Sequence, residues 1–483
     1  MVFSWWGYVK CRRRIEGLFI LNGVSSSVGV LLLLAFTAFI CYSVNNQGLS
    51  NRADVEPLEQ LQRYLTDDAL KSTIQSQHPI NRLQCGSWPD TYAILHRDIL
   101  AGRAAQRYAI IRSRNEWENG LADRIASSVT IFFYALLTNR AFQYDWEGPT
   151  SLWATLNSDY IDWRYTGWDA GNSTMTMDYV AEHNNESEYN SFFVQQDLTF
   201  IGGEAHTVIW HADHAAVYHA FNNPHLKLRL TELGLKQDTA FACLFDFLYR
   251  PTDQVVQALR PYLPALLDPL AVKIGIQIRV GDWQLVNSSR YIIHPQNHPW
   301  LFQHFFDCAA DIEEEAFFLA AVASNQAATA KTDAKPAAAA PPPLRAVWYL
   351  LTDMLEVRLA FKRKYPNRVL VDDQAEIQHT VKDKAATNQS FVQAVGELWA
   401  FSLTDYHIIT KKSGFGKVGA MVSAKTRKHI FTIYYPMQVF NIMGSGGPAF
   451  DNRKVVTMWQ RPRQCGREFA DSLDFVCSDF TGI

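Results

Sequence analysis

The sequence predicts an α/β fold with two doubly wound parallel sheets that face a cleft, preceded by an N-terminal transmembrane helix. Three observations support this fold class. Short apolar runs alternate with helical patterns in two separate stretches of the chain. A long uncharged run lies near the N-terminus. With 483 residues, 48% of them hydrophobic, the chain is large enough for two or three domains, each with its own core.

The uncharged run covers residues 17–44 and follows a basic segment that contains Lys10, Arg12, Arg13 and Arg14. About 20 apolar residues suffice to span a bilayer, and basic residues mark the cytosolic side. We therefore expect a cytosolic tail at 1–16, a signal anchor at 17–44 and a lumenal remainder. The alternative is a cleaved signal peptide, whose apolar core is usually shorter.

Two patterns after this run agree with a lumenal location. N-x-S/T glycosylation sequons begin at Asn172, Asn185, Asn287 and Asn388. Five cysteines follow the anchor, and Cys465 and Cys477 are close enough in sequence to pair in an oxidising lumen. The polar segment 45–75 is predicted to be a stem.

An N-terminal α/β domain, on the acceptor side, is expected over residues 76–269. A strand at 108–112, a Gly-containing loop, a helix at 121–137 and a strand at 141–146 form a βαβ unit, which implies parallel pairing. The polar, Trp-rich region 145–205 is interpreted as surface excursions. Two helices broken at Pro251 precede the next domain.

Histidines are frequent in the stretch 206–221. We expect His211 and Asp213 to share one strand face and His214 to point the other way. A metal site requires three converging ligands, so ordinary packed or polar histidines are the favoured interpretation, and no metal site is predicted.

The second α/β domain is expected over 270–465, followed by a tail at 466–483. The apolar run 271–280 is typical of a central parallel strand. A helix at 302–323 follows it. An Ala/Pro-rich insertion at 324–343 is predicted to be disordered. The strands then expected are 344–353, 368–373 and 406–416, separated by helices at 354–365 and 390–405.

Three strands of this domain end in polar loops, "IRVGD", "LLTD" and "ITKKSGFG". In open parallel sheets ligands bind beyond the carboxyl ends of strands. Arg279 suits phosphate oxygens, Asp353 suits a ribose or guanine edge, and Ser413 with the glycines around it suits an anion. Together they predict a site for a nucleoside diphosphate, although each residue alone is also typical of an ordinary strand end.

Several other classes are disfavoured. The net charge of −3 lacks the basic excess of a nucleic-acid-binding protein. No D-x-D motif, Walker loop, G-x-G-x-x-G or G-x-S-x-G occurs. ATP hydrolysis, NAD chemistry and serine-hydrolase chemistry are therefore poorly supported.

Four segments resemble motifs of one enzyme family, in order over about residues 90–465. They are "NGLADRIASSVTIFFYALLTNRAF", "IGIQIRVGD", "WYLLTD" and "LWAFSLTDYHIITKKSGFGKVGAMVSA". The family is the plant cell-wall (xyloglucan) fucosyltransferases, which are related to the α1,2-, α1,6- and nodulation fucosyltransferases. The resemblance implies a GT-B fold, a Golgi type II membrane enzyme, GDP-fucose as donor, a glycan or glycoprotein acceptor, inversion, and neither metal nor cofactor.

By motif position, the resemblance implies that Arg279 binds the β-phosphate, that Asp353 reads guanine, and that Ser413 opens the phosphate and fucose pocket. The remaining donor-side positions are Gln277, Gly414, Phe415 and Gly416. The N-terminal loop facing the cleft consists of Asn119, Gly120, Asp123 and Arg124.

The chain departs from the family at Gln277, Val280 and Gly414, which leaves the exact donor sugar open. Asp282 is a candidate catalytic base because it lies three residues after Arg279, the alternative being an exposed loop residue. Two other functions stay open: a GT-B transferase for another nucleotide sugar or for protein O-fucosylation, and an inactive lumenal glycan-binding protein.

Overall fold

The computed structural model describes residues 85–114, 120–148, 150–167, 173–179, 192–280, 299–329, 345–374, 387–410, 413–423 and 430–433. The predicted tail, anchor and stem lie outside these residues. Cys465 and Cys477 also lie outside them.

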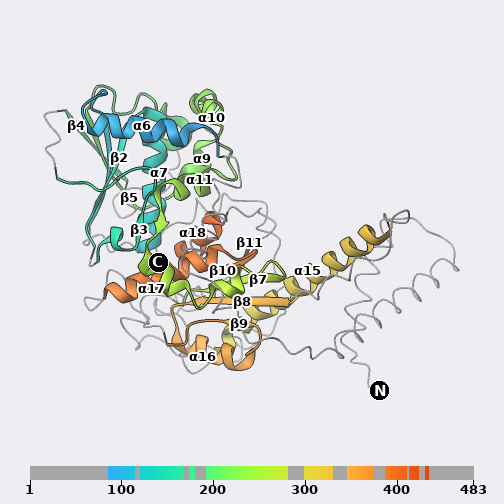
Figure 1. The fold of residues 1–483 in the computed structure, drawn as a ribbon. Coiled ribbons are helices and arrows are strands. Elements are labelled where there is room, and N and C mark those ends of the chain that lie inside the picture. Colours follow the sequence, from blue (N-terminus) through green and yellow to red (C-terminus); the bar gives the residue numbers. More distant parts are fainter. Residues whose placement is uncertain are drawn as a thin grey trace, which may run out of the picture. The chain divides into compact units, whose positions relative to one another are not determined.

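The first sheet has the order β2-β1-β5-β4, and all of its pairs are parallel (Figure 1). Its strands are β1 (Tyr108–Ser113), β2 (Ala141–Trp146), β4 (Thr174–Tyr179) and β5 (Thr207–Ala212). The two strands and the helix of the expected βαβ unit are present, and residues 115–119 of the loop between them lie outside the described residues. Helix α7 (Leu121–Thr138) connects β1 to β2 and ends at Asn139, whose φ of 53° is left-handed.

Helix α7 is the central helix of this part of the chain. Its length and hydropathy would suit a membrane span, but nearly all of it is buried inside the protein, as expected for a core helix. Helix α6 (Trp88–Leu100), with Pro89 in its first turn, packs near β2. Among the described residues, α7 alone passes this test of length and hydropathy.

The region 145–205 was predicted to form surface excursions, and this is wrong in part. Strand β4 adds to the edge of the sheet, where "TMTMDY" alternates between its two faces. Trp163 is 2% exposed and donates its indole N–H to the Leu248 carbonyl oxygen at 2.9 Å. Edge strands with polar alternation give weak sequence signals, which is why β4 was missed.

Short helices and strands lie between β2 and β4 and between the first and second sheets. They are η2 (Leu152–Ala154), β3 (Leu156–Asn157), α9 (Val217–Ala220), η3 (Pro224–Leu226), α10 (Lys227–Leu233), α11 (Ala240–Leu248), β6 (Arg250–Pro251), α12 (Asp253–Leu259) and α13 (Leu263–Leu266). The predicted helix break at Pro251 is confirmed, since it lies between α11 and α12. A disulfide joins Cys85 to Cys243 of α11.

The second sheet has the order β11-β10-β7-β8-β9 and is also parallel (Figure 1). Its strands are β7 (Ala271–Ile278), β8 (Arg345–Thr352), β9 (Val369–Leu370), β10 (Tyr406–Thr410) and β11 (Ile430–Ile433). The predicted central position of β7 is confirmed. The α/β class with two parallel sheets is therefore also confirmed.

The helices of this part are η6 (Pro299–Phe302), α15 (Gln303–Thr329), α16 (Leu355–Lys364), α17 (Asn388–Ser402) and α18 (Gly414–Val422). They cover both faces of the sheet, as the residues of β8 show. Trp348 and Leu350 lie in the core with α15 and α16, whereas Tyr349 and Leu351 lie in the core with α17 and α18.

Two boundaries differ from the prediction. Helix α15 continues to Thr329, so residues 324–329 are helical and not part of a disordered insertion, because "SNQAAT" continues an alanine-rich helix. The "SGFG" segment is not a loop but the start of α18. The rest of the insertion lies outside the described residues.

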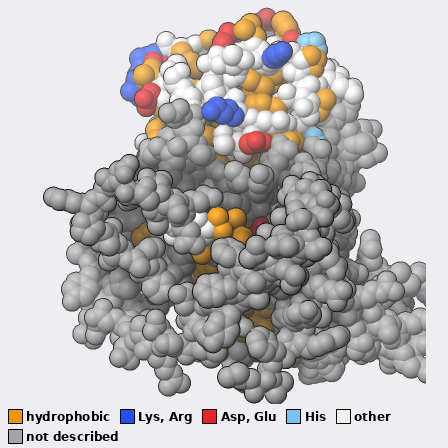
Figure 2. All heavy atoms as spheres, turned by 90° about the vertical axis from the view of Figure 1, so that its right-hand side faces the viewer, with side chains coloured by type: hydrophobic (Ala, Val, Ile, Leu, Met, Phe, Trp, Pro, Cys, Tyr) orange, Lys and Arg blue, Asp and Glu red, His pale blue; other side chains and the backbone are white. Residues whose placement is uncertain are grey.

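On the face in Figure 2, basic, acidic and hydrophobic side chains are interspersed over the described surface. This mixture agrees with the nearly neutral composition, and it gives no support to a nucleic-acid surface on the described part of that face.

Candidate functional site

The carboxyl ends of β10, β7 and β8 lie side by side, because these strands are neighbours in the sheet. Gln277 pairs with Ile409 on one side and with Leu351 on the other. Arg279 therefore follows the central strand of three, and Asp353 follows its neighbour. The predicted convergence of these strand ends is present in the structure.

Arg279 and Asp353 form an ion pair with an Nη1–Oδ2 distance of 3.1 Å. The other Asp353 oxygen, Oδ1, accepts the Val280 N–H at 2.7 Å. The Asp353 side chain is 10% exposed and that of Arg279 is 29% exposed. Asp353 thus holds the guanidinium in place, and part of Arg279 remains open to solvent. The guanine-reading role of Asp353 stays a prediction.

Thr410, the last residue of β10, holds the backbone at Arg279 from the neighbouring strand. Its hydroxyl accepts the Arg279 N–H at 2.9 Å and donates to the Gln277 carbonyl oxygen at 3.1 Å. The sequence reasoning did not single out Thr410. Its position at the end of an apolar strand, level with the Arg279 turn, was the available signal.

Gln277 is 2% exposed, and its side chain is used inside the protein. Its Oε1 accepts the Thr410 N–H at 3.2 Å and lies against Gly416. A Cβ added to Gly416 would come within 2.5 Å of that oxygen. The Gln277 side chain of β7 therefore contacts both β10 and the start of α18. Any side chain larger than that of glycine at position 416 would collide with it.

Ser413 is the N-cap of α18 and is buried, with its hydroxyl accepting the Gly416 N–H at 3.4 Å. Gly414 and Phe415 follow in the first turn and are partly buried. The N-terminus of a helix carries partial positive charge and free N–H groups, which suit an anion. The segment that was expected to bind an anion as a loop is therefore the N-terminus of a helix.

Three residues of the N-terminal loop, Gly120, Asp123 and Arg124, lie at the start of α7. Gly120 is the N-cap, and its N–H donates to Asp123 Oδ2 at 3.2 Å. Arg124 was expected to face the cleft, but it is 2% exposed and donates to the carbonyl oxygens of Glu147 (2.6 Å) and Arg114 (3.1 Å). Through these two hydrogen bonds Arg124 links the residues that directly follow β1 and β2.

Burial and, to a smaller extent, the negative charge of Asp213 raise the pKa of Asp123 to about 7. The Gly120 hydrogen bond and the nearby His214 and Arg279 act in the opposite direction. Asp123, in the first turn of α7, therefore interacts electrostatically with Arg279.

Asp213 and His214 contact each other through Oδ1 and Nδ1. The prediction that these side chains point to opposite faces is wrong, because β5 ends at Ala212 and Asp213 no longer follows strand geometry. Both residues are buried, at 6% and 2% exposed. Within the described parts of the chain, no three His, Cys, Asp or Glu side chains are grouped as a metal site would require.

Most of the remaining predicted site residues lie outside the part of the chain that the structure describes. Asn119, Asp282 and the sequons at Asn172, Asn185 and Asn287 lie outside the described residues. Asn388 is exposed at the first position of α17.

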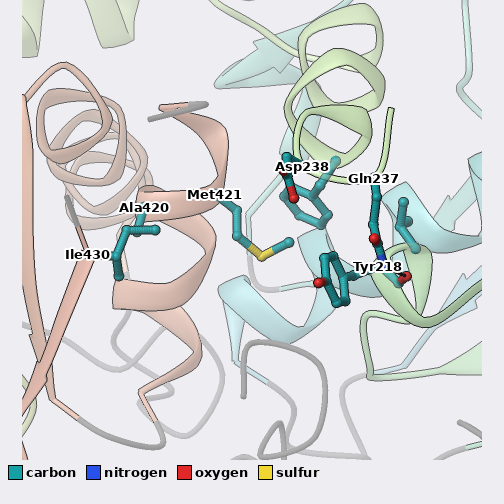
Figure 3. A pocket seen from close by; sticks show the side chains of 8 residues that line it. Tyr218, Gln237, Asp238, Ala420, Met421 and Ile430 are labelled. Carbon is teal, nitrogen blue, oxygen red and sulfur yellow. Dashed lines mark hydrogen bonds between the residues drawn. The ribbon is translucent and has the colours of Figure 1, made fainter. Parts of the chain in front are cut away.

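A small pocket lies between α9, α11, α18 and β11 (Figure 3). It is lined by Val217, Tyr218, Gln237, Asp238, Phe241, Ala420, Met421 and Ile430. Among its described lining residues there is a carboxylate and no cation, so these residues do not suit a phosphate. The strand ends around Arg279 are chemically the better candidate.

No known family model matches the chain. Its curated relatives from Arabidopsis thaliana include fucosyltransferase 10, 25% identical over 253 residues, which are 45% of this chain and 48% of the relative. Galactoside 2-alpha-L-fucosyltransferase is 28% identical over 191 residues, 34% of each chain, and fucosyltransferase 3 is 26% identical over 220 residues, 41% of each chain. The matches span less than half the length of these relatives. They confirm the resemblance to fucosyltransferases.

Two solved structures are similar at low identity. Arabidopsis thaliana FUT1, in a variant bound to GDP, is 19% identical with a TM-score of 0.46 and covers 77% of this chain and 81% of its own. Fucosyltransferase NodZ from Bradyrhizobium is 13% identical with a TM-score of 0.35 and covers 68% of this chain and 96% of its own.

Proposed function

We propose that the protein transfers fucose from GDP-fucose to a glycan hydroxyl, with inversion at the anomeric carbon and without a metal ion. The observation that carries this proposal is the position of Arg279. It follows the central strand of a parallel sheet, is held by Asp353, and shares that sheet edge with the N-terminus of α18. The sequence similarity to fucosyltransferases supports the choice of sugar and nucleotide.

The chemistry places its largest demand on the leaving group. When the bond from the fucose C1 to the β-phosphate oxygen breaks, negative charge grows on that phosphate. A partly exposed guanidinium and a helix N-terminus stabilise such charge without a metal ion. The Asp353 contact and the Thr410 hydroxyl hold Arg279 at the strand end, so little reorganisation is needed during the reaction.

We assign the donor pocket to the start of α18 beside Arg279. Ser413 is the N-cap, Gly414 and Phe415 follow in the first turn, and Gly416 leaves room for the Gln277 side chain. In this proposal the first-turn N–H groups of α18 face the diphosphate and Phe415 borders the fucose.

The acceptor and the cellular compartment are proposed from two further observations. The name of one relative suggests a galactoside as acceptor. The Cys85–Cys243 disulfide supports an oxidising compartment, in agreement with a Golgi lumenal location behind the N-terminal anchor. We propose a single-pass type II membrane protein on this basis.

The proposal is tested by a panel of nucleotide sugars offered to the full-length protein in detergent, with EDTA and lactose as a simple galactoside. Release of free nucleotide from GDP-fucose, and from no other sugar nucleotide, is the expected result. Release from a UDP-sugar, or release only after a divalent metal is added, would overturn it.

Replacing Arg279 tests the site within this reaction. Arg279→Ala should lower kcat by about 100-fold or more, as losing one transition-state charge contact commonly does. Arg279→Lys should recover only part of it, because an ammonium lacks the planar fork. The matched control is Arg97→Ala on the exposed face of α6, which should retain full turnover. Near-normal turnover in Arg279→Ala would remove this residue from the mechanism.

A further inference from the structure

Arg358 of α16 is a buried arginine whose side chain reaches the carboxyl ends of two neighbouring strands. Its Nε and Nη2 atoms donate to the carbonyl oxygen of Thr352, the last residue of β8, at 3.1 and 2.7 Å. Its Nη1 atom donates to the carbonyl oxygen of Asp372, just after β9, at 3.0 Å. Nη1 and Nη2 also donate to Glu397 of α17, at 2.6 and 3.0 Å. These contacts use all five N–H groups of the guanidinium.

The residues that Arg358 holds lie on both sides of Asp353. The guanidinium binds the carbonyl oxygen of Thr352, and the backbone N–H of Arg358 donates to the carbonyl oxygen of Met354 at 3.3 Å. Because the peptide bond is planar, fixing the Thr352 oxygen also fixes the peptide plane that leads into Asp353. Asp353 in turn pairs with Arg279. A continuous series of contacts therefore joins Arg358 to the phosphate-binding cation.

Glu397 supplies the charge that allows a guanidinium to occupy this position. A buried arginine is costly unless a carboxylate pairs with it and its N–H groups are all satisfied. Arg358 and Glu397 meet in the two-pronged geometry that strengthens such pairs, and their side chains are 2% and 10% exposed. Two apolar side chains could stabilise the core equally well, but they could not hold the strand-end carbonyl oxygens.

We propose that Arg358 and Glu397 are positioning residues for fucosyl transfer, which set the direction of Arg279 through Asp353. This inference rests on the proposed function. Glu397 orients Arg358, and Arg358 holds the peptide of Thr352. Asp353 then keeps the Arg279 guanidinium aimed at the phosphate that leaves. A displacement of about 1 Å in a group of this kind can lower a rate about 100-fold, so control of its position affects turnover directly.

The experiment measures kcat and KM for GDP-fucose, with lactose as acceptor, on the full-length protein. Rates are expressed per mole of folded protein, which near-UV circular dichroism measures at the assay temperature. Glu397→Gln keeps the shape of the side chain and one acceptor oxygen but removes the charge. We expect kcat to fall at least 10-fold and KM to stay within threefold of wild type, because the misdirected Arg279 loses its contact chiefly in the transition state.

A double-mutant cycle with Arg279 distinguishes positioning from general support of the fold. If Glu397 acts through Arg279, adding Glu397→Gln to Arg279→Ala should lower kcat by less than a further twofold, since no guanidinium remains to be aimed. If Glu397 only supports the fold, the factor measured for Glu397→Gln alone should appear again in the double variant. That result would overturn the proposal.

Arg358→Lys tests the same contacts should Glu397→Gln be too unstable to assay. Lysine retains a positive charge opposite Glu397 but lacks the planar fork, so kcat should fall about 10-fold with KM little changed. The matched control is Asp268→Asn, which removes the ion pair with Arg345 at the opposite end of β8. The two ends of this strand are about 23 Å apart, so Asp268→Asn should retain the kcat of wild type.

The outcomes distinguish this inference from the proposed function. An active wild type that is impaired by Arg279→Ala, but not by Glu397→Gln or Arg358→Lys, would overturn the positioning role and leave the proposed transfer intact. An equal loss of kcat in Asp268→Asn would show a general effect of removing ion pairs and would overturn it as well. Wild-type protein that releases no nucleotide from GDP-fucose would overturn both proposals.

Discussion

Asp123 occupies a position that usually favours an ionised carboxylate. An aspartate in the first turn of a helix is stabilised by the helix dipole and by a free N–H group, and both are present at the start of α7. Burial and the charge of Asp213 outweigh them and raise the pKa of Asp123. A residue that would ordinarily be a capping group is thereby held in its proton-binding range near neutral pH.

This shift has a consequence for stability that does not depend on activity. The pKa of Asp123 is about 7 in the folded protein, higher than the ordinary value of 3.8 for an aspartate in an unfolded chain. The unfolded chain therefore binds fewer protons between these values, and this group lowers the free energy of unfolding as pH rises from about 4 to 7. Above about pH 7 its unfavourable contribution is complete.

Asp123→Asn should consequently raise Tm more at pH 8 than at pH 4. The check is thermal unfolding of the variant and the wild type at both pH values in the same salt. Asp90→Asn serves as the control, because its difference from wild type should not widen with pH. An equal effect of Asp123→Asn at both pH values would show that its pKa is not raised.

At the scale of elements, the packing of α17 against β7 requires a glycine in the central strand. A Cβ on Gly275 would lie 2.6 Å from Phe401 Cε2 and 2.6 Å from Thr404 Oγ1. Glycine in a strand interior is usually unfavourable, and close approach of a neighbouring element is a common reason for it. Gly275 therefore lets the end of α17 lie directly on the sheet that carries Arg279.

Gly275→Ala should lower the free energy of unfolding by about 1–3 kcal/mol, the usual cost of overpacking a core. Gly396→Ala, in α17 itself, is the matched control. Its added Cβ would meet nothing closer than Ala258 Cβ at 3.6 Å, so the gain in helix propensity should stabilise the protein by about 0.5–1 kcal/mol. Denaturant unfolding measures both. Equal effects of the two substitutions would contradict this account of the packing.

Elements with strong local patterns could be predicted from the sequence. The apolar runs of β1, β2 and β7 and the apolar α7 have periodicity that leaves little choice of structure. Strand β4 was missed because its polar alternation resembles a surface segment. The start of α18 was missed because Ser-Gly-Phe-Gly is typical of a loop, and its helical state depends on Gln277 and on packing against the sheet.

The candidate site was predictable only where it lies on strand ends. Arg279 and Asp353 follow strands whose neighbours could be inferred, so their proximity followed from topology. The ion pair between them, and the electrostatic interaction of Asp123 with Arg279, depend on how distant elements pack. Periodicity carries no information on such contacts.

At the scale of the whole molecule, the Cys85–Cys243 disulfide ties the segment before α6 to α11 across 158 residues of sequence. This interval includes the first sheet and α7. Because both cysteines are buried, at 4% and 1% exposed, the link is enclosed in the core. A cross-link over such a long interval restricts the unfolded chain strongly, which makes it a main contributor to the stability of this part of the protein.

Cys85→Ala should lower the free energy of unfolding by about 3–5 kcal/mol, the loss expected when a long-range disulfide is removed. Cys243→Ala should cost a similar amount. The double variant should cost about the same as either single variant, because either substitution already breaks the cross-link. Denaturant unfolding of the three variants, with peptide mapping of the wild type from a secretory host, provides the measurement. Costs that add in the double variant, or a free thiol at both positions in the wild type, would show that this bond does not connect the two elements and would remove its support for a lumenal location.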